Sequence, residues 1–450
     1  EAMMSDMNRD SNRRAFLRDA AGGVSLAALW HVNPRPAAAS RSPLEKLKLA
    51  SIGTANRAAA NLEGCAGEQI VALADIDDRS LAAAAAKYRG VRTYRDFRAL
   101  LEEESDRVDA VVVSTPDHTH APAAAMALRM GKPVYCEKPL THTVAEARLL
   151  ADLAAEKNLA TQMGTQIHAG DNYRRVVEMV RGGVIGPVRE VHVWAAATYN
   201  GGPLKKAQKP TGVDWDLWLG PAAEREYVEC AIEGRPATVH PYYWRWYWDY
   251  GNGGLGDFGC HFMDLAHWAL DLQHPTSVAA SGPEPDSVAT TSGVVVQYEY
   301  PARGELPPVS LTWYDGGKRP PKLQEYRDES GNRFDWKSGQ LFIGERGAIL
   351  SDYGRRRLLP VANAADFDIP EPSIPDSIGH HREWIEAIKS GSATTCNFGY
   401  SGALTEAVLL GVVSYRSGEE LKWDAANLKV TNSPKAQQLI HKEYRDGWSL

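Results

Sequence analysis

The chain has 450 residues, of which 44% are hydrophobic and 24% are charged, and it carries a formal net charge of −7 at pH 7. A chain of this length has room for two or more domains with substantial cores. The acidic balance and the lack of a long basic run argue against nucleic acid as a partner. Beyond the N-terminus, no stretch approaches the roughly 18 apolar residues that a membrane-spanning helix needs, so no span is expected.

The N-terminal residues have the features of an export signal. The paired arginines Arg13 and Arg14 precede a short apolar run at 20–30, and alanines at 37–39 offer the small side chains that a signal peptidase requires. This pattern predicts a twin-arginine signal or N-terminal arm over residues 1–40, and therefore a periplasmic protein. The alternative is a basic amphipathic helix that belongs to the fold.

Residues 45–165 alternate between strand and helix patterns. The run at 108–114 is almost continuously β-branched, which is typical of a strand buried on both faces. Strands that alternate with helices of this length predict a parallel, doubly wound α/β domain. The expected strands are 47–53, 70–75, 108–114, 134–137 and 160–163. The expected helices are 54–62, 80–88, 94–101, 121–130 and 144–157.

The alternation ends after Gly164, and residues 166–430 predict a second, α+β domain with a mostly antiparallel open sheet. Residues 431–450 form a C-terminal tail. The five cysteines show no metal-ligand spacing and cannot all pair, so the question of a disulfide stays open. The expected strands are 188–197, 292–300, 309–314, 340–343 and 348–351. The expected helices are 171–181, 380–389 and 405–415.

The first strand-to-helix turn carries a partial dinucleotide motif. A G-x-G-x-x-G pattern survives only as Gly53-Thr-Ala55-Asn-Arg-Ala58, where the helix start would hold a pyrophosphate. Asp75 ends the next strand, where a carboxylate accepts hydrogen bonds from the adenosine ribose. Since a carboxylate repels a 2′-phosphate, NAD is favoured over NADP, although Arg79 nearby leaves NADP open.

Two further loops follow buried strands. Lys138 lies in Glu137-Lys-Pro139, where a ligand would face the carboxyl ends of the strands. The loop from Ser114 to His120 is expected under the nicotinamide side of a dinucleotide. The alternatives are a surface Lys-Pro turn and a capped turn with solvated histidines. A zinc site is disfavoured because no third ligand lies nearby in the sequence.

The stretch 242–250 is rich in Trp and Tyr. These are too many to bury with a hydrogen-bond partner for every Trp N–H and Tyr O–H group, and exposed aromatic rings are suited to stacking on sugar faces. Trp244, Trp246 and Trp248 are the candidate platform. If a helix begins near Asp257, then Asp257, His261 and Asp264 share one face, and a carboxylate beside an imidazole is suited to acid–base chemistry. The alternative is an N-cap Asp with a core His.

Together, Asp75, the Thr-Pro-Asp-His-Thr-His loop, Glu-Lys-Pro and the Gly-Asp-x-Gly-x-His-x-x-Asp motif resemble the glucose–fructose oxidoreductase / inositol dehydrogenase (Gfo/Idh/MocA) family over residues 45–430. Matches at 163–166, 214–221 and 313–317 resemble an exported subgroup with a Trp/Tyr-rich substrate domain. The resemblance implies a Rossmann domain, an open sheet that usually forms the oligomer interface, and a nicotinamide cofactor between them.

By motif match, the resemblance implies that Lys138, Asp257 and His261 are catalytic, with no metal. Glu137 and Pro139 would shape the cofactor pocket. The cofactor-binding residues expected are Gly53, Ala55, Asn56, Arg57, Asp75, Ser114, Thr115, Pro116, His118, His120, Glu137, Lys138, Pro139 and Gln166. The substrate-binding residues expected are His168, Tyr173, Trp244, Arg245, Trp246 and Asp264.

The resemblance therefore implies an exported NAD(H)-dependent oxidoreductase acting on a hydroxyl of a pyranose sugar, glycoside or polyol. His261 would take the hydroxyl proton, Lys138 would stabilise the alkoxide, and Asp257 would orient His261 or share its proton. Export favours a tightly held cofactor. The resemblance to the family implies a homo-oligomer, either a dimer or a tetramer. The alternatives are a redox-neutral glycoside hydrolase or lyase that oxidises its sugar transiently, and a non-catalytic sugar sensor.

Overall fold

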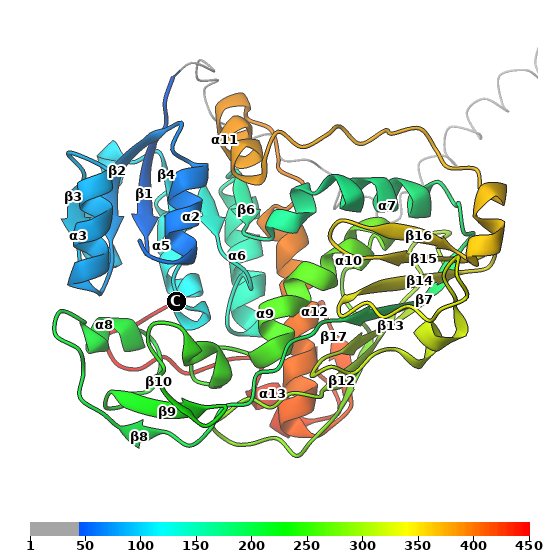
Figure 1. Cartoon of the computed structure of the whole chain (residues 1–450). Helices are drawn as coiled ribbons and strands as arrows, with labels where there is room; N and C mark the ends of the chain where they lie inside the picture. The colour runs from blue at the N-terminus through cyan, green and yellow to red at the C-terminus, as the bar shows by residue number, and fades with distance from the viewer. Residues whose placement is uncertain (1–44) are drawn as a thin grey trace, which may run out of the picture. The chain divides into compact units, whose positions relative to one another are not determined.

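A computed structural model describes residues 45–450, apart from the side chain at position 363 (Figure 1). The predicted export signal and arm at 1–40 lie outside the described residues. Within residues 45–450, no helix is both long enough and apolar enough to cross a membrane.

The N-terminal part of the described chain is a six-stranded parallel sheet in the order β3-β2-β1-β4-β5-β6, covered by helices (Figure 1). The predicted doubly wound sheet is confirmed. The sequence did not reveal β3, which has only three residues and a largely exposed pattern. The strands are β1 (Lys48–Ile52), β2 (Gln69–Ala74), β3 (Arg92–Tyr94), β4 (Ala110–Val113), β5 (Val134–Cys136) and β6 (Thr161–Met163). The helices are α2 (Arg57–Gly64), α3 (Asp78–Lys87), α4 (Phe97–Glu104), α5 (Asp117–Arg129) and α6 (Val144–Glu156).

The strand order reverses between β1 and β4, whose residues pair in parallel from Leu49 and Ala110 onward. All four residues of β4 are buried, as the β-branched run predicts. In an open α/β sheet, ligands bind outside the carboxyl ends of the strands at such a switch point. The segments that follow β1, β4 and β5 are therefore the ones placed to meet a ligand.

The second sheet has nine strands in the order β16-β15-β14-β7-β13-β12-β11-β17-β18. Every neighbouring pair is antiparallel except β7 and β13, which confirms the mostly antiparallel prediction. The strands are β7 (Val188–Trp194), β11 (Ser277–Ser281), β12 (Val295–Tyr300), β13 (Val309–Tyr314), β14 (Gly339–Gly344), β15 (Ala348–Ser351), β16 (Arg356–Leu359), β17 (Leu421–Asp424) and β18 (Lys429–Val430).

The helices of this second part connect its sheet to the first one. The long helix α12 packs against α6 of the parallel sheet and against α9, β11 and β12 of the second part. It begins seven residues earlier than predicted, after the N-cap Asn397, whose side chain accepts a hydrogen bond from the Tyr400 N–H. The helices are α7 (Asp171–Arg181), α9 (Gly253–Phe262), α10 (Asp264–Leu270), α11 (His380–Ser390), α12 (Phe398–Ser417) and α13 (Pro434–Gln438). Short 3-10 turns occur at η2 (Ser105–Arg107), η3 (Gln166–Ala169), η5 (Pro321–Glu325) and η6 (Val361–Asp366).

Residues 200–250, here called the covering segment, fold over the carboxyl edge of the parallel sheet (green in Figure 1). The Asp78 N–H donates to the Gly212 carbonyl, and the Asp214 N–H donates to the Ile76 carbonyl, each at 2.9 Å. The sequence did not predict its regular structure because these strands are short and mostly exposed. They are β8 (Lys205–Lys206), β9 (Val228–Ile232) and β10 (Arg235–Thr238), with α8 (Trp215–Leu219) and η4 (Tyr243–Trp246).

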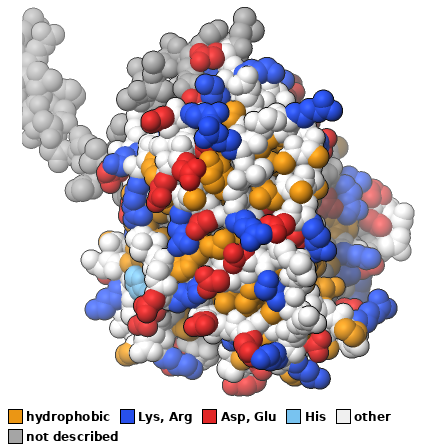
Figure 2. Space-filling view, turned by 90° about the vertical axis from the view of Figure 1, so that its left-hand side faces the viewer, with side chains coloured by type: hydrophobic (Ala, Val, Ile, Leu, Met, Phe, Trp, Pro, Cys, Tyr) orange, Lys and Arg blue, Asp and Glu red, His pale blue; other side chains and the backbone are white. Residues whose placement is uncertain are grey.

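The C-terminal tail also packs on the parallel-sheet part. The Ala145 N–H donates to the Ile440 carbonyl at 3.1 Å, and the Arg98 guanidinium lies 4.3 Å from the Trp448 ring centre. All five cysteines are buried and free. Figure 2 shows the face that carries α3, where acidic and basic side chains are interspersed with apolar ones.

Candidate active site

Lys138 leaves the buried strand β5 and reaches across to α9 in the second part of the chain. Its Nζ donates hydrogen bonds to the Asp257 carboxylate Oδ1 at 2.5 Å and to the Asp257 backbone carbonyl at 2.7 Å. The two side chains are only 14% and 13% exposed. The two predicted catalytic residues, 119 positions apart in the sequence, therefore form one partly buried ion pair at the carboxyl edge of the parallel sheet.

Two more groups converge on the Asp257 carboxylate. The Tyr199 hydroxyl donates to Oδ2 at 2.5 Å, and the Arg245 Nε lies 3.4 Å from Oδ1. Burial by itself would raise the pKa of Asp257, but the charges of Lys138 and Arg245 and the hydrogen bonds hold that pKa well below its ordinary value. Asp257 is therefore a carboxylate at neutral pH, and its partner is Lys138.

His261 lies one helical turn after Asp257 on α9. Its Nδ1 is buried and has no hydrogen-bond partner among residues 45–450. Burial, followed by the charge of Lys138, lowers the pKa of His261 to about 3, so the imidazole is neutral at physiological pH. The site thus holds a cation, a carboxylate and a neutral imidazole. No hydrogen bond joins Asp257 to His261 in the described structure. Asp257 therefore orients Lys138 instead of the expected His261.

The helix boundaries differ from the prediction. Helix α9 begins at Gly253 rather than near Asp257, and Asp264 starts the next helix, α10. Asp264 is fully buried and accepts hydrogen bonds from Tyr400 Oη at 2.7 Å and His168 Nδ1 at 3.0 Å. Asp264 and His168 therefore form an internal pair, away from the open side of the site. Tyr173 is also buried, and its hydroxyl donates to the His261 carbonyl at 3.0 Å.

The predicted exposed platform of tryptophans is wrong. Trp244, Trp246 and Trp248 are only 5%, 6% and 5% exposed. Trp244 and Trp246 are buried in a second core that the covering segment supplies and that the sequence did not reveal, whereas Trp248 packs into the main core. Trp246 stacks against Tyr199 with ring centres 4.1 Å apart and so supports the Asp257 network from behind.

Three residues at the site were not predicted. Asp117 opens α5 and is buried, and burial together with the Asp257 charge raises the pKa of its carboxyl well above the ordinary value. Tyr353, which is 39% exposed, places its ring 6.3 Å from the His261 ring. The third is Tyr199. Asp117 resembles an ordinary helix-start residue in the sequence, and both tyrosines come from loops that no local pattern connects with α9.

The turn after β1 fits a pyrophosphate. Gly53 has a φ of +91°, and a Cβ there would lie 2.6 Å from the Ser114 carbonyl oxygen, so only glycine allows the two loops to approach. Asn56 precedes α2 without a side-chain capping bond, so no side chain occupies the start of the helix, although the Ala58 N–H donates to the Ala55 carbonyl at 3.0 Å. Ala55, Asn56 and Arg57 lie at this open end.

Asp75 lies at the predicted strand end, but its carboxylate already accepts hydrogen bonds from neighbouring protein groups. Its Oδ2 accepts from the Thr54 N–H at 2.9 Å and the Thr54 hydroxyl at 2.7 Å, and its Oδ1 accepts from the Asp77 N–H at 3.0 Å. A cavity of about 530 Å³ opens beside this turn between α2 and α3, lined in part by Asp77 and Arg79. Arg79 lies 3.4 Å from the Asp77 carboxylate, which is a second negative charge that would repel a 2′-phosphate at this cavity.

The Glu137 carboxylate accepts several hydrogen bonds within the predicted cofactor pocket. Its Oε1 accepts hydrogen bonds from Arg57 at 3.2 Å, Asn61 at 2.9 Å and Gln166 at 2.9 Å. Asn61 also donates to the Ser114 hydroxyl at 2.9 Å. The predicted residues Arg57 and Gln166 thus contact the Glu137 carboxylate directly, and Asn61, which was not predicted, connects Ser114 to it.

The two histidines expected in the loop after β4 lie instead in the first turn of α5, where both are fully buried and contact protein groups. His120 lies between the carbonyl oxygens of Pro139 and Thr115, 2.8 Å from each, and so fixes the Lys138 turn against this loop. His118 Nε2 lies 2.9 Å from the Trp218 carbonyl of the covering segment. Both histidines therefore hold the segments around the pocket in place through contacts with backbone carbonyl oxygens. In residues 45–450, no group of three or more His, Cys, Asp or Glu side chains could hold a metal ion.

Comparisons with known proteins agree with this architecture. Residues 47–165 match the Gfo/Idh/MocA model described as an oxidoreductase family with an NAD-binding Rossmann fold, and residues 176–305 match the model of its C-terminal alpha/beta domain. The two models together cover more than half of the chain.

An inositol 2-dehydrogenase from Rubrobacter xylanophilus is 32% identical over 151 residues, which cover 32% of this chain and 43% of that protein. The chain thus spans less than half the length of the curated relatives it matches. Among solved structures, GenD2 from gentamicin A biosynthesis in complex with NAD has a TM-score of 0.56 at 19% identity, over 86% of this chain and 99% of that one. Levoglucosan dehydrogenase in complex with NADH has a TM-score of 0.54 at 17% identity, over 84% and 98%. At these identities the structures establish similarity of fold.

The Lys138–Asp257 pair predicts a pH-dependent contribution to stability. Since the folded protein lowers the pKa of Asp257 from 3.8, the stabilisation is complete above that value and is lost as the pH falls through the lowered pKa. Lys138→Met should lower the free energy of unfolding at pH 7 by about 1–3 kcal/mol, because Arg245 and Tyr199 remain as partners. Thermal melting of both proteins from pH 7 down to about pH 3 measures this. A difference that widens in acid would contradict the assignment.

Proposed function

The chain belongs to the Gfo/Idh/MocA oxidoreductase family, and from this premise we propose that it is an NAD(H)-dependent oxidoreductase acting on a hydroxyl of a pyranose sugar, glycoside or polyol. The observation that carries the proposal is the Lys138–Asp257 pair at the carboxyl edge of the NAD-binding domain. The names of an inositol 2-dehydrogenase and a levoglucosan dehydrogenase among the similar proteins support the substrate class.

The three polar residues divide the work on the substrate hydroxyl. When bound, NAD supplies a hydride acceptor at the nicotinamide ring. Lys138 donates a hydrogen bond to the hydroxyl oxygen and stabilises the charge that develops on it, in a site largely shielded from water. The neutral imidazole of His261 accepts the hydroxyl proton. Asp257 holds the Lys138 ammonium in place through the carboxylate and its own backbone carbonyl.

Arg245 and Tyr199 fix the position of Asp257. The Arg245 guanidinium lies 4.1 Å from the Trp244 ring centre, so its planar group is held over an aromatic face while Nε approaches Asp257. Tyr199 is backed by Trp246. Rigid support of this kind keeps catalytic groups within the narrow geometry that hydride transfer requires.

The covering segment favours a tightly held cofactor. It closes over the turn after β2, where the adenosine ribose is expected, through backbone hydrogen bonds at Ile76 and Asp78. Its far end is anchored by the C-terminal tail: Arg445 donates to the Gly220 carbonyl and pairs with the Asp216 carboxylate, each at 2.6 Å. We propose that release of the cofactor requires this segment to open.

Export and self-association belong to the same proposal. The paired arginines at 13 and 14, with the apolar run that follows, support a twin-arginine route to the periplasm. An exported enzyme without a nicotinamide pool needs a retained cofactor, which accords with the covering segment. Family resemblance supports a homo-oligomer. Cell fractionation of a double Arg→Lys variant at these positions tests export, and accumulation of that variant in the periplasm would refute it.

The proposed activity predicts a spectral change in the purified protein. Aldoses, glycosides and polyols are added singly to the dialysed protein, and the band near 340 nm of reduced nicotinamide is recorded. One substrate should raise the band stoichiometrically. Lys138→Met should reduce the rate by at least about 100-fold because the developing alkoxide loses its cation. The exposed Lys429→Met is the matched control and should match the wild type.

The contradicting results are distinct for each alternative. A band that never rises with any sugar, even with NAD added, would overturn the oxidoreductase proposal and favour a sensor if sugars still bind. A glycoside that is cleaved without net reduction of NAD would instead establish the redox-neutral hydrolase.

The covering segment predicts how long the cofactor is retained. Arg445→Ala removes the anchor at Asp216 and Gly220 and should speed cofactor loss by about tenfold, since one or more charge-assisted hydrogen bonds are broken. The measurement is the nucleotide-to-protein ratio after repeated gel filtration, with the exposed Arg357→Ala as the control. Equal retention in all three proteins would show that the segment does not hold the cofactor.

A further inference from the structure

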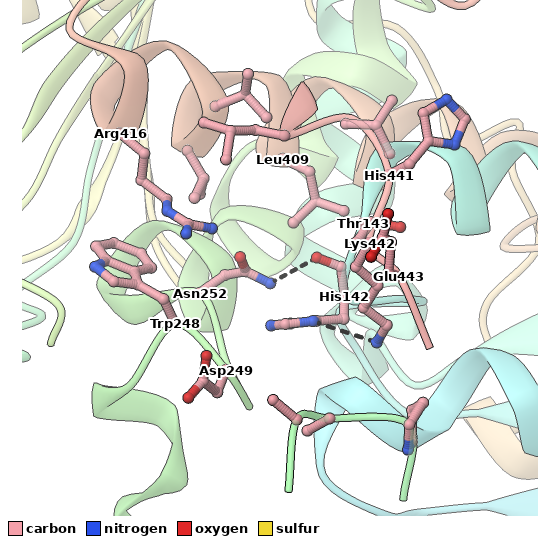
Figure 3. Close-up of a pocket in the computed structure, with 17 residues that line it drawn as sticks. His142, Thr143, Trp248, Asp249, Asn252, Leu409, Arg416, His441, Lys442 and Glu443 are labelled. Carbon is pink, nitrogen blue, oxygen red and sulfur yellow. Dashed lines mark hydrogen bonds between the residues drawn. The ribbon is translucent and has the colours of Figure 1, made fainter. Parts of the chain in front are cut away.

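A separate cavity of about 280 Å³ lies between the start of α6, the C-terminal half of α12 and the C-terminal tail (Figure 3). Apart from Trp248, which was a candidate for the sugar platform, none of the residues that line it belongs to the predicted catalytic, cofactor-binding or substrate-binding sets. Its volume is close to the lower limit of the roughly 300–1,000 Å³ that small-molecule sites span, so it suits a small ligand.

Arg416, near the end of α12, turns its guanidinium into this cavity (Figure 3). The group lies 5.1 Å from the Trp248 ring centre and has no hydrogen bond or ion pair with any residue of the described chain. Burial lowers the pKa of Arg416, which reflects the cost of holding this charge away from water. A largely buried guanidinium with unused donors is stabilised by an anion that takes them up.

His142 supplies a second unused donor at the same cavity. The residue is 8% exposed, and its Nδ1 faces the Lys442 ammonium at 3.4 Å, so Nδ1 acts as the acceptor and the proton is on Nε2. Nε2 is buried and has no hydrogen-bond partner; the Gly251 carbonyl is near but outside hydrogen-bond geometry. In Figure 3 this end of the ring points toward the side of the cavity where Arg416 and Asp249 lie.

The other charged groups around the cavity are already paired or lie at its rim. Lys442 is bound to Glu146 at 3.0 Å, and Asp249 is bound to Arg225 at 2.7 Å. Glu443 is exposed at the mouth. The charge of Asp249 opposes the effect of burial on the pKa of Arg416, but no hydrogen bond or ion pair joins the two residues, so the donors of Arg416 remain unused. The carboxylates around the cavity disfavour a second negative charge on the ligand. The remaining wall is mainly apolar: Val144, Ala222, Trp248, Leu409, Val412, Val413 and Leu439.

We propose that this cavity binds a small organic monocarboxylate, whose carboxylate pairs with Arg416 and His142 while its apolar body packs against α12. The planar guanidinium matches a carboxylate in two parallel hydrogen bonds. A doubly charged phosphate would meet Asp249 and Glu443 without a second free cation. The cavity thus selects for a single charge joined to an apolar group.

The site adjoins both segments that carry the catalytic residues. His142 follows Lys138 by four positions, and Asn252, which precedes α9, donates its Nδ2 to the His142 carbonyl at 3.1 Å. Asn252 lines the same cavity. A bound monocarboxylate therefore contacts the turn after β5 and the start of the helix that holds Asp257.

Direct binding measurements test this proposal without any sugar or turnover. Sodium lactate, sodium butyrate and inorganic phosphate are titrated separately into the purified protein at constant ionic strength, with tryptophan fluorescence and melting temperature as readouts, because Trp248 forms one wall. A monocarboxylate should give a saturable change and raise the melting temperature. Arg416→Met should weaken binding by about tenfold or more, while the exposed Arg357→Met should bind as the wild type does.

A second variant keeps the test valid if Arg416→Met is unstable. Ala223 is exposed at the cavity mouth, and Ala223→Trp should block entry while leaving the fold intact. Unaltered binding in both variants would overturn the proposal, as would saturation by phosphate alone or no saturation by any monocarboxylate. Since the assay needs no hydride transfer, its failure is separable from failure of the proposed oxidoreductase activity.

Discussion

The geometry of the candidate active site depends on one ion pair between two parts of the chain, Lys138 with Asp257. Neither charge would be stable in so enclosed a position alone, because burying an unpaired charge costs several kcal/mol. The pair therefore requires the parallel sheet and α9 to lie against each other in one arrangement. That same arrangement brings His261 and Asp117 to the edge where a nicotinamide cofactor is expected. The same ion pair thus contributes both to the proposed chemistry and to the contact between the two parts of the chain.

Around this pair, hydrogen bonds between buried polar groups fix the positions of the loops. Glu137 accepts hydrogen bonds from two donors on α2 and one on η3, and His120 connects the Lys138 turn to the loop after β4. Because each buried donor or acceptor must find a partner, these bonds leave the loops few alternative positions. The pocket is thereby preorganised for its ligand. The cavity at Arg416 differs, since its donors still lack partners within the described chain.

Sequence reasoning succeeded where the physical signal is local. Sequence patterns predicted five of the six parallel strands to within two residues at each end, and they predicted α7 to the residue. Strand-end positions brought Lys138, Glu137 and the Gly53 turn to one edge. It failed where burial depends on distant segments. Trp244 and Trp246 are buried because the covering segment, itself unpredicted, folds around them. Tyr199 and Tyr353 reach the site from loops whose positions only the tertiary structure determines.

The most direct test of the central claim is the position of a bound substrate. The Lys138→Met protein, expected to bind but not oxidise, would be crystallised with NAD and the sugar that the spectral assay identifies. The account predicts that the reacting carbon faces the nicotinamide ring, with its hydroxyl between the position of the lost Lys138 Nζ and the His261 imidazole. A sugar bound well away from Asp257 and His261, with the nicotinamide ring turned from them, would contradict it.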